Sequence, residues 1–185
     1  MLCNDLIAAQ RDFIRRLNTI SFAADFYKTI IGIADLNRLL STVRKLIKDE
    51  LANANISFFL RNANSSTDPS GLWDTPESDE SIASAKKRLE KYFTNEVIEN
   101  ICKSNKMCSI DEMFAMGLQG NLIELNKISA CAVPLSHLGQ AIGFILVYRS
   151  SENKLTADEL HKISAVTCGI SRALQSCQEL SHIGD

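Results

Sequence analysis

Residues 131–148 read CAVPLSHLGQAIGFILVY, two apolar runs separated by a short polar segment. We expect strands over residues 128–135 and 140–149, joined by the five-residue turn SHLGQ, where Gly139 can adopt the positive φ that hairpin turns often need. Alternate positions of the second run are apolar on both sides of the strand. A strand of this kind is covered on both faces, so the pattern predicts a central strand of an antiparallel sheet.

Two residues of this stretch, Cys131 and His137, also suggest chemistry. The six cysteines of the chain are scattered, and none forms a CxxC pair of the kind found in zinc sites or thioredoxin-like motifs. An isolated cysteine in a cytosolic protein most often behaves as a small buried apolar residue. A single histidine in a turn is most often solvated. We therefore read the stretch as structural and expect no metal site.

Upstream of the hairpin, residues 36–51 carry a broad apolar face that predicts a helix, and Asp35 is its expected N-cap. Residues 56–61 are β-type and end in a segment rich in Asn, Ser, Asp, Pro and Gly, which indicates a first strand and its exit. We expect a further strand near residues 71–73.

The following segment favours helix over residues 78–104, with a break near Thr94 that could cap the second piece. We expect a short strand over residues 108–113 and then a loop as far as Asn126. Downstream of the hairpin, Thr156 and Glu159 form a capping-box pattern before a long apolar stripe. This pattern predicts a C-terminal helix.

The N-terminal 31 residues carry an apolar stripe with alternating steps of three and four, interrupted by Gln10. This heptad spacing predicts a long helix facing a partner helix, as in a dimer seam. The alternative is an amphipathic helix lying on the sheet of its own domain. The expected seam residues are Leu6, Phe13, Leu17, Ile20, Ala24, Tyr27 and Ile31, with Cys3 at the start.

Length and composition limit the possible classes of protein. With 185 residues, 45% hydrophobic and 23% charged, the chain suits one soluble domain plus an extra helix. We assign residues 1–34 to a signalling or dimerisation helix and residues 35–181 to the domain. A net charge of −2 argues against nucleic-acid binding, and no apolar stretch is long enough to span a membrane. We expect a cytoplasmic protein.

The order helix, helix, strand, variable middle, hairpin and helix is that of an α+β domain. At this point the sequence resembles a GAF domain, a small-molecule sensory module of signalling proteins. The resemblance is carried by ADLNRLLSTVRKLIKDELANANISFFLRN, AVPLSHLGQAIGFILVYRSS and KLTADELHKISAVTCGISRALQ, and it covers about residues 35–180. PAS domains are the nearest rival, but the hairpin and the capped terminal helix fit GAF better.

The resemblance implies a central antiparallel sheet with N- and C-terminal helices on one face and a ligand pocket, closed by the variable middle, on the other. It also implies a homodimer through flanking helices and an output domain or partner protein outside this chain. The sequence does not identify a ligand or cofactor. The candidate pocket residues, each of which could also be plain core, are Phe58, Leu60, Trp73, Met107, Phe114, Met116, Cys131 and Val133.

More specific GAF activities find less support in the sequence. Asn153, Lys154, Asp158 and Glu159 resemble the ends of the cyclic-nucleotide pattern, but they equally suit a helix start. Cys102 and Cys108 lack the adjacent histidine of bilin attachment, and His137 is a weak haem ligand. The main enzyme alternative is a thiol reductase of the free methionine sulfoxide reductase type, using Cys102, Cys108 and Cys131. Our leading hypothesis is a non-catalytic sensory or regulatory domain.

Overall fold

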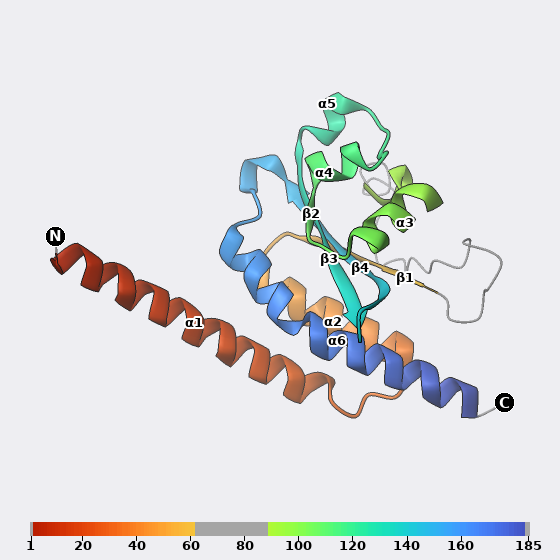
Figure 1. The fold of residues 1–185 in the computed structure, drawn as a ribbon, viewed down its shortest axis with the longest axis horizontal. Coiled ribbons are helices and arrows are strands. Elements are labelled where there is room, and N and C mark those ends of the chain that lie inside the picture. The colour runs from red at the N-terminus through yellow and green to blue at the C-terminus, as the bar shows by residue number, and fades with distance from the viewer. Residues whose placement is uncertain (1, 62–88, 184–185) are drawn as a thin grey trace. The chain divides into compact units, whose positions relative to one another are not determined.

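The computed structural model describes residues 2–61 and 89–183, and it is an α+β structure with one antiparallel sheet (Figure 1). The expected α+β fold class, with helices before and after the sheet in the chain and a long N-terminal helix, is confirmed. No helix among the described residues has the length and apolar character needed to cross a membrane. The elements are α1 (Leu2–Ile30), α2 (Leu36–Glu50), β1 (Asn55–Leu60), η2 (Leu89–Tyr92), α3 (Asn95–Ser104), β2 (Cys108–Ser109), α4 (Ile110–Ala115), α5 (Leu122–Leu125), β3 (Ile128–His137), β4 (Gln140–Ser150), η3 (Ser151–Asn153) and α6 (Ala157–Ile183).

The four strands of the sheet lie in the order β1-β4-β3-β2. Strand β4 pairs with both β1 and β3, and its residues 143–149 are all buried. The expectation of a central strand with two apolar faces is therefore confirmed. Gly143 permits the close approach of β1, because a Cβ atom there would lie 2.0 Å from the carbonyl oxygen of Phe59.

The hairpin turn is tighter than the sequence suggested. The strands extend to His137 and Gln140, which pair directly, so only Leu138 and Gly139 form the turn. Both have positive φ, 48° and 80°. A two-residue turn of this hand matches the right-handed twist of the flanking strands. The prediction of a five-residue turn was wrong because Leu138 adopts a backbone conformation that non-glycine residues seldom take.

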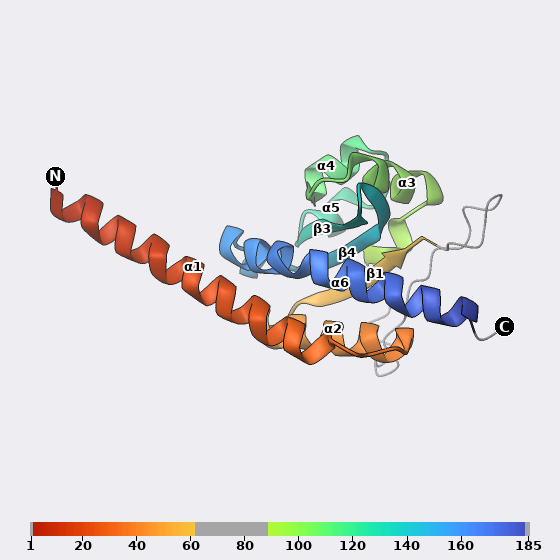
Figure 2. The same cartoon turned by 60° about the horizontal axis from the view of Figure 1, so that its bottom comes forward.

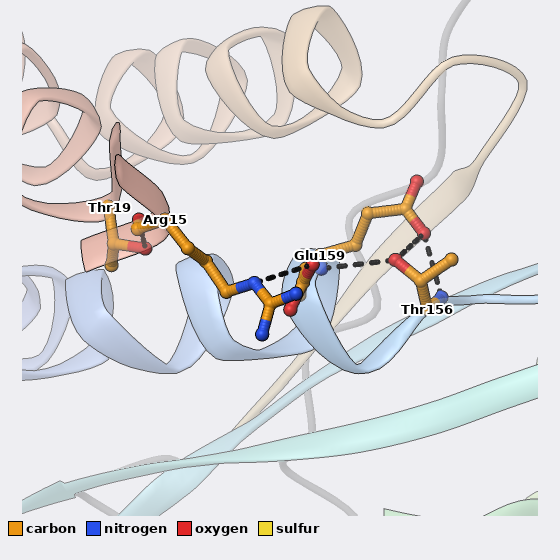
Figure 3. A network of polar contacts seen from close by, with 5 residues as sticks. Arg15, Thr19, Thr156 and Glu159 are labelled. Atoms are coloured by element: carbon orange, nitrogen blue, oxygen red, sulfur yellow. Dashed lines mark hydrogen bonds and ion pairs between the residues drawn. The ribbon is translucent and has the colours of Figure 1, made fainter. Parts of the chain in front are cut away.

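Several helix starts follow the predicted caps. Asp35 Oδ1 accepts a hydrogen bond of 2.7 Å from the Arg38 N–H at the start of α2. Thr94 caps α3 through the Val97 N–H, which places the helix break where the sequence predicted it. Thr156 and Glu159 exchange the two hydrogen bonds of a capping box at the start of α6 (Figure 3).

The middle segment departs from the sequence predictions. Residues 108–113 form only the two-residue strand β2, because Ser109 and Glu112 form a second capping box that begins α4 at Ile110. The expected loop as far as Asn126 contains α4 and α5. The strand expected near residues 71–73 and the first part of the helix expected over 78–104 lie outside the described residues.

The chain divides into two compact units, residues 44–155 and residues 1–43 with 156–185. In the first unit, α3, α4 and α5 pack on one face of the sheet (Figure 1). Their buried residues, including Val97, Ile101, Met113 and Leu125, form one apolar core with residues of β1, β3 and β4.

In the second unit, α1 and α6 run parallel to each other. Arg15 of α1 pairs with Asp158 near the start of α6 (Figure 3). Further along, the Tyr27 hydroxyl donates a 2.7 Å hydrogen bond to the Ala165 carbonyl. Gly169 makes room for the Tyr27 ring, because a Cβ atom there would lie 2.0 Å from a ring carbon. The first half of α1 extends beyond the start of α6 (Figures 1 and 2).

Candidate functional site

The face of the sheet covered by α3 and α4 is where the resemblance placed a ligand pocket. Three phenylalanine rings fill its centre: Phe59 stacks on Phe144 with centroids 4.8 Å apart and on Phe93 at 5.1 Å. Phe144 has no exposed surface. Stacked rings at these distances bury a large apolar area. The described part of this face is thus occupied by the protein's own side chains.

The predicted pocket residues of the strands lie on the opposite face. In the pairing register Phe58 lies opposite Ile145 and Cys131 opposite Val147, whereas Phe59 lies opposite Phe144. Directly opposed residues share a face and neighbouring residues alternate. Phe58, Leu60, Cys131 and Val133 therefore face away from α3 and α4, and the choice of face was wrong. Arg44 of α2 lies over the Phe58 ring, with its guanidinium carbon 5.5 Å from the centroid.

The middle-segment candidates behave differently from one another. Phe114 and Met116 are partly buried and pack on the apolar core of this unit, whereas Met107 is exposed. The Asn100 side chain donates to the Met116 carbonyl at 3.0 Å and so fixes the end of α4 to α3. Trp73 lies outside the described residues.

A polar cluster on the α3 face was missed by the sequence analysis. The hydroxyls of Ser57 and Tyr148 both donate to the Glu90 carboxylate, Tyr148 at distances of 2.9 and 3.1 Å. Ser57 and Tyr148 are buried. Buried hydroxyls need such partners, so Glu90 attaches η2 to the sheet. Nothing in the spacing of these three residues could have indicated their contact.

A small cleft of about 230 Å³ lies where the end of α3 meets the β3–β4 turn. Its polar lining consists of Arg61, Glu99, Cys102, Lys103 and Asn105. Lys103 pairs with Glu99 at 3.0 Å. Sites for drug-sized ligands occupy roughly 300 to 1,000 Å³, so this cleft suits only a smaller molecule.

The three cysteines of the enzyme alternative lie in the same unit. Burial raises the pKa of the Cys131 thiol to about 12, with further contributions from Cys108 and Glu112. At neutral pH such a thiol is thiolate in only about one molecule in 10⁵, and the thiolate is the nucleophile. Burial also raises the pKa of Cys102, although Arg61 acts in the opposite direction. The buried Cys108 thiol donates to the Lys106 carbonyl at 3.2 Å.

The residues considered for other cofactors have structural contacts. Asp158 and Glu159 bind Arg15 and Thr156 at the start of α6, and His137 pairs with Gln140 in the hairpin. Within residues 2–61 and 89–183, no three His, Cys, Asp or Glu side chains are grouped so that they could hold a metal ion.

The predicted dimer seam lies on α1 and is mostly exposed. Leu6, Phe13, Leu17, Ile20 and Ile31 are between 48% and 80% exposed. Ala24 is exposed too, whereas Tyr27 is half-buried against α6. A different face of the same helix, with Phe26 and Ile30, is buried. We call the exposed residues the α1 stripe: Leu6, Phe13, Leu17, Ile20, Ala24 and Ile31.

Comparison with solved structures identifies the arrangement of sheet and helices. The GAF domain of a phosphoenolpyruvate-protein phosphotransferase from Coxiella burnetii superimposes with a TM-score of 0.64 over 90% of this chain and 98% of that chain, at 11% sequence identity. The chain has the GAF fold. A GAF sensor protein from Burkholderia vietnamiensis gives a TM-score of 0.59 over 89% and 98% of the two chains, at 13% identity.

The GAF fold is also that of fRMsr of Staphylococcus aureus, solved in complex with its substrate. That structure gives a TM-score of 0.55 over 85% of this chain and 95% of that chain, at 14% identity. The sequence matches no protein-family profile and no curated protein. At these identities the likeness establishes the fold and leaves the activity to be argued from the residues.

Proposed function

We propose that this chain is a non-catalytic GAF-type sensory or regulatory module of a cytoplasmic signal-transduction protein. It acts as a homodimer through α1 and controls an output domain or partner protein outside this chain. The observation that carries the proposal is the α1 stripe. Monomeric proteins seldom expose a large apolar patch, and here five large apolar side chains along one helix face are 48% to 80% exposed at a heptad spacing that suits a second helix.

The contacts between α1 and α6 supply a route for a signal. Tyr27 and Arg15 join α1 to α6 at two separate levels, through a hydrogen bond to Ala165 and an ion pair with Asp158. A displacement of α6 would therefore move α1 with it. In a dimer held by α1, such a movement changes the spacing or rotation of the two chains, which is how an output domain would sense it.

The dimer is tested with Leu17→Glu/Ile20→Glu, which places two carboxylates in the α1 stripe. Burying unpaired charge costs several kcal/mol, so we expect the association constant to fall at least about 100-fold. Light scattering after size-exclusion chromatography measures the mass, and circular dichroism checks that helix content is retained. The control Asn18→Glu/Thr29→Glu adds the same charge at exposed positions outside the stripe and should stay dimeric. A wild-type protein that is monomeric at all concentrations contradicts the dimer.

A small-molecule ligand remains part of the proposal, since the solved relatives include a sensor protein. Native mass spectrometry of freshly purified protein would detect a bound molecule directly. Thermal-shift screening of nucleotides, amino acids and carboxylates would reveal one through the stabilisation that binding to the native state produces. Absence of both signals would favour a module that only dimerises.

The second candidate is a thiol reductase of the free methionine sulfoxide reductase type, favoured by the structural likeness to fRMsr. The raised pKa of Cys131 argues against that residue as its nucleophile. The test is thiol-dependent turnover of methionine sulfoxide by the wild type and by a variant with all six cysteines replaced by serine. Turnover above background that disappears in the variant would contradict the non-catalytic module and support the thiol reductase.

A further inference from the structure

A groove of about 630 Å³ is lined by the end of α1, by the turn that follows it and by α6. Its lining residues all belong to the unit of residues 1–43 and 156–185. The volume falls within the range of roughly 300 to 1,000 Å³ that is usual for small-molecule sites. The α6 wall runs from Cys168 to Ser176, which corresponds to about 12 Å along the helix. The groove is therefore large enough for a small organic molecule.

The two walls of the groove are joined at both ends. The Tyr27 hydroxyl donates a 2.7 Å hydrogen bond to the Ala165 carbonyl of α6. Further along α6, the Cys177 thiol donates to the Ile33 carbonyl at 3.3 Å. Ala165 and Cys177 lie just before and just after the lining residues of α6, so the two bonds fix the separation of the walls. The groove is therefore preformed.

The lining of the groove is mostly apolar. Isoleucine, alanine and glycine supply most of it, and the Ser176 hydroxyl already donates to the Arg172 carbonyl. Among the described lining residues, Arg172 alone is charged, and its side chain is exposed. Within residues 2–61 and 89–183, no carboxylate pairs with the Arg172 guanidinium. The groove thus combines an apolar hollow with one available cation.

These properties select a class of ligand. An apolar hollow binds a hydrocarbon or aromatic body through the burial of its surface. A guanidinium presents a planar fork of N–H donors that matches the two oxygens of a carboxylate. Burial, and then the charge of Asp35, raise the pKa of the Cys177 thiol, so a negative charge lies near that end of the groove. A second anionic group on the ligand would be repelled there.

We propose that the groove binds a monocarboxylate with an apolar body, its carboxylate on Arg172 and its body against Gly169 and Ala173. Such a ligand contacts α1, the turn after it and α6 at once. The inference gives the sensory role proposed above a ligand class and a site. It rests on that proposal for its regulatory meaning, whereas the binding itself does not depend on the dimer.

The test compares octanoate with octanol, which has the same apolar body without the charge, by isothermal titration calorimetry. We expect the wild type to bind octanoate at least about tenfold more tightly than octanol, because charge-assisted hydrogen bonds are the stronger ones. Arg172→Gln should remove this preference. The matched control Arg11→Gln removes a cation at an exposed position of α1 outside the groove and should keep it.

Two further measurements locate the site. Ala173→Phe places a ring in the groove and should weaken the binding of octanoate and octanol alike by at least about tenfold. Cys168 is exposed and lines the groove, so octanoate should slow its alkylation by a maleimide in the wild type but not in Arg172→Gln. Peptide mapping separates Cys168 from the other cysteines. This second readout does not depend on the folding of the phenylalanine variant.

Contrary results are distinguishable from one another. Equal affinity for octanoate and octanol in the wild type, or an unchanged preference in Arg172→Gln, contradicts the inference. Octanoate that binds the stripe variant Leu17→Glu/Ile20→Glu but not a dimeric wild type contradicts it too, and means that a second copy covers the groove. In every case, light scattering on the same samples shows independently whether the proposed dimer stands.

Discussion

The core packed against α3 and the exposed face of α1 differ in how far their phenylalanine side chains are buried. Phe144 is fully buried in a stack with Phe59, whereas Phe13 on α1 is 61% exposed. Both belong to regular apolar patterns, and burial of either would be favourable. The apolar side chains of the sheet core are covered within the chain, whereas those of the α1 stripe are exposed in it. This difference is the reason for proposing α1 as the interaction surface.

The largest change in stability is expected for Phe144→Ala, in the core packed against α3. Removing a fully buried aromatic ring from the stack should lower the free energy of unfolding by about 3–5 kcal/mol, because a cavity is left beside the Phe59 and Phe93 rings. Urea denaturation measures the change. The matched control is Ile123→Ala on α5, where the side chain is 72% exposed and the expected change is within about 0.5 kcal/mol. Similar losses in both variants would contradict the packed core.

A smaller effect is expected where α1 meets α6. Gly169→Ala should destabilise the protein by about 1–2 kcal/mol through overpacking, since the new methyl group would lie on the Tyr27 ring. Alanine is otherwise better than glycine in a helix by about 1 kcal/mol. In a Tyr27→Ala background the same substitution should therefore become stabilising. Urea denaturation measures the free energy of unfolding for each member of this double-mutant cycle. If Gly169→Ala changes that free energy in the same direction in both backgrounds, the result contradicts the Tyr27–Gly169 contact.

The smallest expected effect is a pH dependence at the start of α4. Hydrogen bonds from the Ser109 backbone N–H, and then from its hydroxyl, lower the pKa of Glu112. A lowered pKa means that the stabilisation is present above the ordinary glutamate pKa and is lost as the pH falls through the lowered value. The melting-temperature difference between wild type and Glu112→Gln should thus shrink on acidification. An NMR titration of Glu112 in Ser109→Ala, which keeps the backbone N–H but removes the hydroxyl, should show its pKa closer to the ordinary value, and an unchanged pKa would contradict the contribution of the hydroxyl.

Much of the fold could be predicted because its signals are local. Asp35, Thr94 and Thr156 cap helices through bonds to residues three positions away, so spacing in the sequence is enough to find them. The central strand was evident from apolar residues on both of its faces. The same double-sided pattern hid which face carries α3, because a shift of one residue exchanges the faces and neither looks different in the sequence.

The candidate site was less accessible to sequence reasoning. Phe58 and Phe59 are adjacent and chemically identical, yet only Phe59 belongs to the aromatic stack. Glu90 meets Tyr148 from 58 positions away. Gly169 lies in the middle of a predicted helix, where glycine lowers stability, and so it indicated the close packing found there against the Tyr27 ring.

The sequence alone determined the starts of α2, α3 and α6, the pairing of the two hairpin strands, the double-sided central strand and the heptad stripe, because each depends on neighbours within a few positions or on a simple period. Only the tertiary structure decided which side of α1 packs on α6 and which side remains exposed. It also decided which face of the sheet the aromatic rings fill. These features depend on contacts between distant segments, and no local period specifies which of two apolar surfaces a distant element will cover.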